Sequence, residues 1–391
     1  MKYNFDAPKN RRGTVSLKWC TEENELPMWV ADMDFEAAPP IKKAILETAE
    51  HAVFGYSVIP DEFFSACADF YNERYGAGFK AEEMVYSSGI VAAISSMVRK
   101  LTTPGENVLV QSPVYNVFYN SILNNGRNVL SSPLVYENGE YGMDFQDLEE
   151  KLSDKQTSLM ILCNPHNPVG KIWDRETLAR LAELCYKNGV TVISDEIHSP
   201  LTRPGTCYVP FASVSEVARK ISVSCVAASK AFNLAGLQAS TLYVSDPVLR
   251  HKVWRGINTD EVGEPNVFSM RANIAAYKES RDWLDELRVY LFENRRLAEE
   301  YIEKNLPKLK AVKSDASYLL WVDISAYSCD SEEFARDLRE KTGLWVNDGK
   351  EYGKGGECFV RINLATQKAL VKEGLERLSE YVKLTKKAQI N

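Results

Sequence analysis

Lys230 is the residue of this sequence whose surroundings best suit covalent chemistry. It follows the apolar run 221–228 and lies among small and aromatic residues in ASKAFN. Desolvation lowers the pKa of a lysine, so that its amine can act as a base or form a Schiff base with a carbonyl compound. A lone lysine is more often a solvated surface charge, so this interpretation depends on the residues that accompany it.

Polar and aromatic side chains also follow other short apolar runs, which we interpret as strands at 84–88, 107–111, 158–163 and 190–194. In an open parallel sheet, ligands bind beyond the carboxyl ends of the strands. We therefore expect the residues that follow these runs to gather with Lys230 at one site. They are Gly89, Ile90 and Val91 at the start of a helix that can bind an anion, and then Tyr115, Asn167, Asp195, His198 and Ser229.

Each of these residues also has a purely structural interpretation. Asp195 is suited to capping a turn, Tyr115 to packing in a core, and His198 to a structural hydrogen bond. Asn164 and Asn167 precede prolines, so NPHNPVG predicts a loop before it predicts a ligand contact. The coincidence of all these groups at successive strand ends favours a shared site.

The elements that must position these side chains alternate along residues 46–281. In 175–187 the apolar residues recur at helical spacing, and Asn188-Gly189 supplies a stop before the strand at 190–194. Strands that alternate with helices predict an α/β fold, in which a mainly parallel sheet has helices on both faces. We expect residues 46–281 to form one large domain.

The pattern changes after residue 281 to an α+β arrangement. We expect residues 282–391 to form a smaller domain, together with the N-terminal segment 1–45. Its predicted elements are a helix over 282–306, strands within 310–324 and 358–364, and helices over 331–342 and 367–385.

Composition excludes several classes of protein. The net charge of −7 argues against a nucleic-acid-binding protein, and a polar N-terminus without any long apolar run predicts no signal peptide and no membrane span. We interpret the eight cysteines as reduced core residues of a cytoplasmic protein rather than as disulfides or zinc ligands. The four histidines lack a metal-binding spacing.

No G-x-G-x-x-G follows an early strand, which argues against a Rossmann dinucleotide enzyme.

Several motifs resemble those of pyridoxal 5'-phosphate (PLP) enzymes of fold type I in the class I/II aminotransferase superfamily. They are NPHNPVGKIW (164–173), SDEIHSP (194–200) and ASKAFNLAGLQ (228–238). With PMWVADMDF (27–35), FGYSVIP (54–60), SPVYNVFYN (112–120) and FVRINLA (359–365), the set is similar to the MalY/PatB group of cystathionine β-lyases. The resemblance implies a seven-stranded type of sheet between helices, and a homodimer with a shared active site.

The resemblance also implies a role for each residue. Lys230 would hold PLP covalently and then remove the substrate Cα proton, and Asp195 would pair with the pyridinium nitrogen. Arg361 would bind the substrate α-carboxylate through its bidentate fork. The remaining assignments are Asn167 and His198 at the phenolate oxygen, Tyr115 stacked on the ring, Gly89, Ile90, Val91 and Ser229 at the phosphate, Tyr56 reaching the phosphate from the neighbouring subunit, and Asn167, Asp32 and Met33 at the substrate.

Two positions depart from the wider aminotransferase pattern and favour a lyase. Ala227 replaces a common Ser, and Gln238 replaces a common phosphate-binding Arg; both changes are typical of the MalY-like group. We therefore predict α,β-elimination of cystathionine or related S-substituted cysteines to a thiol such as homocysteine, pyruvate and ammonia, a reaction of methionine biosynthesis. Two alternatives stay open: a PLP-dependent aminotransferase for aromatic or other neutral amino acids, and a PLP-fold regulator that acts through a protein partner.

Overall fold

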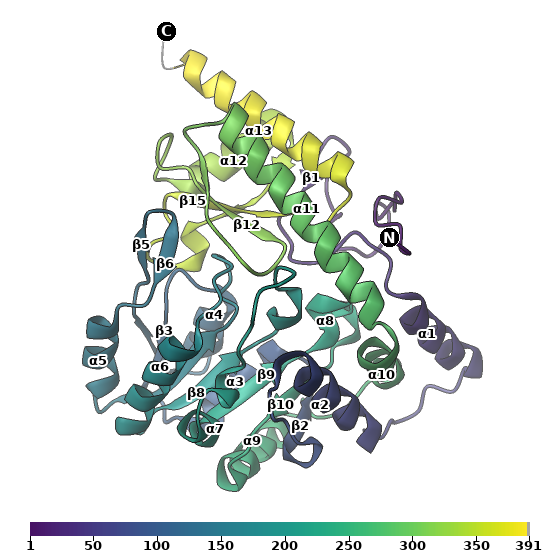
Figure 1. Ribbon diagram of the computed structural model, residues 1–391, viewed down its shortest axis with the longest axis vertical. Helices are drawn as coiled ribbons and strands as arrows, with labels where there is room; N and C mark the ends of the chain where they lie inside the picture. The colour runs from purple at the N-terminus through teal and green to yellow at the C-terminus, as the bar shows by residue number, and fades with distance from the viewer. Residues whose placement is uncertain (389–391) are drawn as a thin grey trace.

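The computed structural model describes residues 1–388, and its centre is a seven-stranded sheet (Figure 1). The strands are β2 (Met84–Ser87), β3 (Asn107–Val110), β4 (Asn128–Ser131), β7 (Thr157–Cys163), β8 (Thr191–Asp195), β9 (Ser222–Val226) and β10 (Ser240–Tyr243). Their order is β2-β10-β9-β8-β7-β3-β4. Only β10 runs antiparallel to its neighbours in this sheet. The predicted α/β fold with a mainly parallel sheet is confirmed.

Both faces of this sheet are covered by helices, which explains why its central strands are apolar throughout. In β7, Leu159, Ile161 and Cys163 face one core layer, and Met160 and Leu162 face the other. The first layer includes α3 (Ile90–Leu101), α4 (Val117–Leu123) and α9 (Pro247–Thr259), and the second includes α5 (Phe145–Ser153), α6 (Arg175–Lys187) and α7 (Glu216–Ile221). Alternate residues of a strand point to opposite faces, so both sets of side chains are buried.

The helix α6 begins and ends where its sequence predicts. The Asp174 side chain accepts a hydrogen bond from the Thr177 backbone N–H at 2.7 Å and caps the first turn. The helix ends at Lys187, and Gly189 then adopts a positive φ of 71° that glycine tolerates without strain. The chain can therefore reverse at once into β8, which carries Asp195 at its end.

Three further helices pack together beside the large sheet. α1 (Pro39–His51) contacts α10 (Ser269–Glu279), and α10 contacts α2 (Asp61–Tyr75). Residues 52–60, which join α1 to α2, have no regular structure. A small hairpin of β5 (Val135–Glu137) and β6 (Glu140–Gly142) completes this part of the chain.

The C-terminal part forms a second, four-stranded antiparallel sheet in the order β11-β12-β15-β14. The strands are β11 (Lys310–Ala311), β12 (Leu319–Asp323), β14 (Asn347–Asp348) and β15 (Phe359–Asn363). In Figure 1 it lies above the large sheet with α11 (Arg281–Asn305), α12 (Ser331–Thr342) and α13 (Lys368–Ala388), and α11 runs down to α10. Arg361 lies opposite Trp321 on one side and Asn347 on the other.

The N-terminal segment contacts both parts of the molecule. β1 (Leu26–Pro27) pairs in parallel with β13 (Leu344–Trp345), whereas α1 packs on α10 beside the large sheet. The division of the chain into 46–281 and 1–45 with 282–391 stays a prediction. None of the helices within residues 1–388 is long and apolar enough to cross a membrane.

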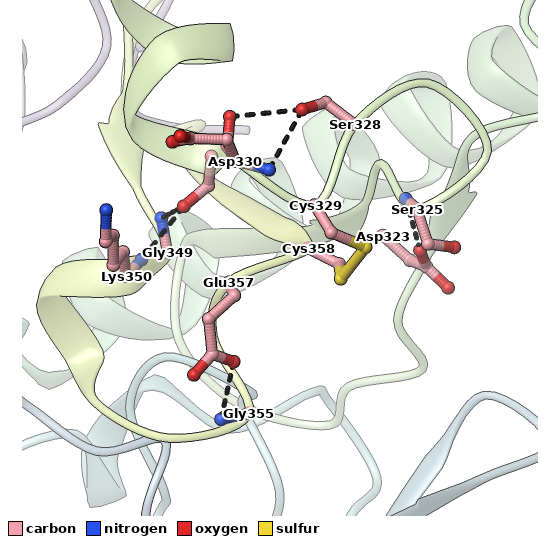
Figure 2. The surroundings of a disulfide bond; sticks show 11 residues. Asp323, Ser325, Ser328, Cys329, Asp330, Gly349, Lys350, Gly355, Glu357 and Cys358 are labelled. Carbon is pink, nitrogen blue, oxygen red and sulfur yellow. Dashed lines mark hydrogen bonds between the residues drawn. A yellow bond between two sulfur atoms is a disulfide. The ribbon is translucent and has the colours of Figure 1, made fainter.

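Cys329 and Cys358 form a disulfide, so the prediction that every cysteine is reduced is wrong for this pair (Figure 2). The cause is non-local strand pairing: Asp323 of β12 lies opposite Phe359 of β15, which brings the segment after β12 beside Cys358. The Cα atoms of the two cysteines are 4.0 Å apart although the residues are 29 positions apart in the sequence. The other cysteines are free: Cys67, Cys163, Cys185 and Cys225 are buried, and Cys20 and Cys207 are exposed.

Candidate active site

The residues that follow the strands of the large sheet meet in one cavity of about 540 Å³. Its walls include Gly89, Ile90, Val91, Tyr115, Asn167, Asp195, His198, Ser229 and Lys230. This volume falls in the range of small-molecule sites. A larger hollow of about 710 Å³, lined by Lys171, Arg203 and Lys310 among others, contains none of these residues. The gathering of the strand-end residues favours the smaller cavity as the active site, and their individual roles stay predictions.

Lys230 presents its amine to this cavity from α8 (Ala228–Ala231), which follows β9 directly. The amine donates a hydrogen bond to the carbonyl oxygen of Ala31 at 2.7 Å. Burial lowers the pKa of Lys230 to about 8; the cation of Arg361 adds to this effect, and the carboxylates of Asp32 and Asp195 oppose it. Part of the amine is therefore neutral near physiological pH, as a nucleophile or base requires.

Asp195 ends β8 between two neighbouring strands and is almost fully buried. Its carboxylate accepts a hydrogen bond from the backbone N–H of Ile197 at 3.1 Å. Burial raises the pKa of Asp195 to about 6, although this hydrogen bond and the Lys230 cation favour the charged form. These two interactions do not offset the free-energy cost of burying the carboxylate, so a cationic group beside Asp195 would stabilise its charged form.

His198 contributes a neutral imidazole to the cavity wall. Burial lowers the pKa of His198 to about 3, and the positive charges of Lys230 and Arg361 act in the same direction. Its ring meets that of Tyr318 edge-on, and its Nδ1 atom is buried without a hydrogen-bond partner within residues 1–388. Buried polar atoms are normally satisfied, so this nitrogen marks a place where a polar ligand atom fits.

The N-terminus of α3 forms another part of the wall. Gly89 precedes the helix and provides no side-chain cap, and its carbonyl accepts the hydrogen bond of Ala93 N–H at 3.0 Å. The N–H groups of Ile90 and Val91 therefore have no partner within the helix and suit an anion such as a phosphate. Gln238 also lines this cavity. Ala227, the residue after β9, is buried and does not line it.

Arg361 is a buried cation beside the cavity, and it comes from β15 of the smaller sheet. Its guanidinium donates to the Asn167 side-chain oxygen at 3.2 Å, to the Trp29 carbonyl at 3.0 Å and to the Asn347 side-chain oxygen at 2.7 Å. All three acceptors are neutral, and its Nε atom has no partner among the described residues. A buried guanidinium without a carboxylate partner is well suited to binding the carboxylate of a substrate.

Tyr115 and Asn167 both line the cavity, and Asn167 also contacts this arginine. The Tyr115 ring packs edge-on against Phe118 at a centroid distance of 5.6 Å, and burial raises the pKa of its phenol. Asn167 lines the cavity and also accepts the hydrogen bond of Arg361. The Asn167 amide thus links the cavity that we expect to hold the cofactor with Arg361, the residue that we expect to bind the substrate.

Besides Arg361, which lies beside the cavity, three predicted residues do not line it in the single chain. Asp32 forms an ion pair with Arg11 at 2.8 Å, and the Met33 side chain is buried in the core. Ala31 is the residue of this segment that lines the wall. Tyr56 lies in the irregular segment 52–60 and is fully exposed. The roles of these three residues stay predictions.

The structure adds residues that position the wall and that sequence reasoning missed. Asn363 donates hydrogen bonds to the carbonyls of Val30 and Asp32, and Asn233 donates to the carbonyl of Met33. The Tyr318 hydroxyl donates to the same Ala31 carbonyl as Lys230, at 2.9 Å. The only available signal was proximity in sequence, because Asn363 follows Arg361 by two positions and Asn233 follows Lys230 by three.

These features fit a pyridoxal phosphate group. Lys230 offers an amine of lowered pKa, Asp195 a buried carboxylate, and α3 free N–H groups for a phosphate. The unsatisfied Nδ1 atom of His198 offers a further polar contact. The side chains of Tyr115, Ile90 and other wall residues supply apolar surface for an aromatic ring.

Comparisons with known proteins agree with this description. The family model for aminotransferase class I and II matches residues 24–378. The chain is 44% identical to a protein of Bacillus subtilis strain 168 named cystathionine beta-lyase PatB, over 96% of this chain and 98% of that protein. Among solved structures, PLP-containing cystalysin from Treponema denticola is 30% identical with a TM-score of 0.93, covering 98% of this chain and 99% of that one. A PLP-bound C–S lyase from Staphylococcus hominis is 32% identical with a TM-score of 0.91, covering 97% and 98%.

Proposed function

The chain belongs to the aminotransferase class I and II family, and on that premise we propose that it is a PLP-dependent carbon–sulfur lyase. It catalyses the α,β-elimination of cystathionine or related S-substituted cysteines, and it releases a thiol, pyruvate and ammonia. The observation that carries this proposal is the amine of Lys230, which shares one cavity with the buried carboxylate of Asp195 and lies beside the uncompensated cation of Arg361. Similarity to lyases over nearly the whole chain supports it.

PLP, when bound, supplies an electron sink that stabilises negative charge at the substrate Cα. Lys230 would hold it, and Asp195 would pair with its ring nitrogen, because burial makes the Asp195 anion unfavourable unless a cation lies beside it. Asn167 and His198 would contact the phenolate oxygen, and Tyr115 would pack on the ring. Its phosphate would meet the N–H groups at the start of α3 and the neighbouring hydroxyl of Ser229.

The chain's own groups would bind the substrate and move its protons. Arg361 would hold the α-carboxylate and so fix the Cα–H bond relative to Lys230. Once the substrate amine has displaced it, the neutral amine of Lys230 would take the Cα proton. The electron pair of the Cα–H bond would then form the Cα–Cβ double bond, while the Cβ–S bond breaks with its own pair leaving on sulfur. Water would hydrolyse the released 2-aminoacrylate to pyruvate and ammonia. The resulting Lys230 ammonium holds a proton that can neutralise the departing thiolate.

The exposed segment 52–60 supports a homodimer, which we propose as the working form. Val53, Phe54, Tyr56 and Val58 all project large side chains into solvent, with exposed fractions of 66%, 59%, 105% and 82%. Apolar surface of this kind typically marks an interaction site. A second copy would cover it and would place Tyr56 at the phosphate of the neighbouring cavity.

Mixed dimers test this arrangement. One subunit carries Tyr56→Phe and the other carries Lys230→Ala. If Tyr56 acts across the interface, the site with an intact Lys230 receives an intact Tyr56 from its partner, so the mixed dimer has one complete site. Recovery of about a quarter to a half of the activity on mixing is expected. No recovery, with the subunits shown to exchange, refutes a shared site.

We also propose a cytoplasmic location and a role in methionine biosynthesis, where released homocysteine is used.

Product analysis tests the lyase assignment against transamination. The purified holoenzyme is incubated with cystathionine, and pyruvate is measured with lactate dehydrogenase. In parallel, aromatic amino acids are offered with a keto-acid acceptor. Pyruvate formation without an added acceptor supports elimination. Turnover that needs the acceptor and gives no thiol supports an aminotransferase instead.

A further inference from the structure

A chain of hydrogen bonds leads from Arg361 through Asn347 to Glu351 and Asn116. The proposed reaction assigns no role to Asn347, Glu351 or Asn116. Its Nη2 donates to Oδ1 of Asn347 at 2.7 Å, and Nδ2 of Asn347 donates to Oε1 of Glu351 at 2.7 Å. The other carboxylate oxygen, Oε2 of Glu351, accepts from Nδ2 of Asn116 at 2.7 Å. The chain thus runs from Arg361 in β15 to Asn116, the residue after Tyr115 in the large domain.

The direction of these bonds depends on the charge of Glu351. An ionised carboxylate only accepts hydrogen bonds, whereas an amide side chain offers acceptors at one end and donors at the other. Since Glu351 accepts from Asn347, the Asn347 oxygen must face Arg361. A reversed amide would aim its NH₂ group at the guanidinium N–H groups and at a buried positive charge.

The intervening amide also keeps Arg361 available. A carboxylate in direct contact would neutralise the guanidinium and compete with the carboxylate of a substrate. Glu351 makes no ion pair with Arg361 within 4.0 Å, because Asn347 lies between them. The Glu351 carboxylate therefore fixes the orientation of the Arg361 guanidinium through Asn347, and it leaves the guanidinium free to bind a substrate carboxylate.

The segment that carries Glu351 is firmly attached. The backbone N–H groups of Gly349 and Lys350 both donate to the Ser331 hydroxyl, at 3.1 and 3.0 Å. Glu351 N–H donates to the Asp348 side chain at 3.2 Å. Figure 2 shows the Cys329–Cys358 disulfide that joins the far end of this segment to the residues before α12. The position of the Glu351 carboxylate is consequently set by the fold.

We propose that Glu351 is a positioning residue for recognition of the substrate α-carboxylate, and that it acts through Asn347 on Arg361. This inference rests on the proposed function, which assigns the α-carboxylate to Arg361. It predicts that removal of the Glu351 charge weakens ligands that carry an α-carboxylate and leaves ligands without one unchanged.

A matched ligand pair measures this directly with the holoenzyme. 2-Methylalanine has an α-carboxylate and no Cα proton, so it binds without elimination, and isopropylamine is the same amine without the carboxylate. Calorimetry, supported by cofactor absorbance, gives the Kd of each ligand. Glu351→Gln should weaken 2-methylalanine about tenfold, equivalent to ~1.4 kcal/mol, and should leave isopropylamine within a factor of about two.

Glu332→Gln is the matched control. It makes the same chemical change at an exposed residue that pairs with Lys350 of the same segment. It should change neither Kd, and thermal unfolding should show that both variants stay folded. In steady-state kinetics with cystathionine, Glu351→Gln should raise KM more than it lowers kcat.

A double-mutant cycle tests the path through Asn347. In the Asn347→Ala background the Glu351→Gln substitution should have little further effect on the Kd of 2-methylalanine. An undiminished effect there, or equal weakening of both ligands by Glu351→Gln, overturns the proposal.

The wild-type and Arg361→Lys proteins separate this inference from the proposed function. If the wild type binds both ligands equally, or if Arg361→Lys leaves 2-methylalanine unaffected, the assignment of Arg361 fails and the inference fails with it. If Arg361→Lys weakens 2-methylalanine and Glu351→Gln does not, only the role of Glu351 is refuted.

Discussion

The neutral fraction of the Lys230 amine predicts how pH sets the rate at which the cofactor-free protein takes up PLP. Burial lowers the pKa of this amine from the ordinary lysine value of 10.5 to about 8. At pH 7 an amine with a pKa of about 8 is about 9% neutral and one at 10.5 is about 0.03% neutral, a difference of roughly 300-fold. Only the neutral amine attacks an aldehyde, so Lys230 should react roughly 300 times faster than an exposed lysine of equal intrinsic reactivity.

Rapid mixing of the cofactor-free protein with PLP between about pH 6.5 and 9.5 measures this rate through the absorbance of the attached cofactor. The rate should rise about tenfold per pH unit below pH 8 and level off above it, since the amine is then mostly neutral. Lys230→Ala is the control, because it removes the amine and retains Asp195 and His198. It should show no attachment at any pH.

A rate that keeps rising tenfold per unit through pH 9.5 would refute the reasoning. Such a profile means that Lys230 keeps an ordinary pKa and that burial does not activate it. Attachment in Lys230→Ala at the wild-type rate would place the covalent bond on another lysine.

Three other substitutions have defined outcomes. Asp195→Asn should lower kcat/KM for cystathionine at least about a hundredfold, because loss of one partner of a buried charge pair costs on the order of 3 kcal/mol; activity within tenfold of wild type contradicts the assigned pairing. Arg361→Lys should raise KM about tenfold or more, because lysine lacks the bidentate fork, and an unchanged KM contradicts carboxylate binding. Cys329→Ser should lower the free energy of unfolding by ~3 kcal/mol because it removes the disulfide with Cys358, and calorimetry should show an equal loss in wild type upon reduction; equal unfolding temperatures with and without reductant contradict this.

The strand-end residues were predictable because one geometric rule governs them. Parallel strands place their carboxyl ends at the same edge, so Tyr115, Asn167, Asp195 and Lys230 follow from short apolar runs alone. The strands β4 and β10 were not predicted. β4 is an edge strand that is only partly buried, and β10 is four residues long and begins with two hydroxyl residues, so neither stands out as an apolar run.

The residues on the Arg361 side of the site could not be found from local sequence patterns. Arg361 was assigned through family resemblance, and its contact with Asn167 joins residues 194 positions apart. No local pattern links Ala31, Asn347 or Glu351 to this site, because each reaches it only when the small sheet or the N-terminal segment packs against the elements of the large sheet. The Cys329–Cys358 pairing was missed for the same reason.

Product stoichiometry with cystathionine tests the central claim most directly. The holoenzyme is incubated with cystathionine in the absence of any keto acid, and free thiol, pyruvate and ammonia are measured in the same samples. A carbon–sulfur lyase releases the three products in equal amounts, and Lys230→Ala releases none. If the wild-type holoenzyme binds cystathionine but forms no thiol or pyruvate, while it exchanges amino groups between amino acids and keto acids, the chain is an aminotransferase and the account is contradicted.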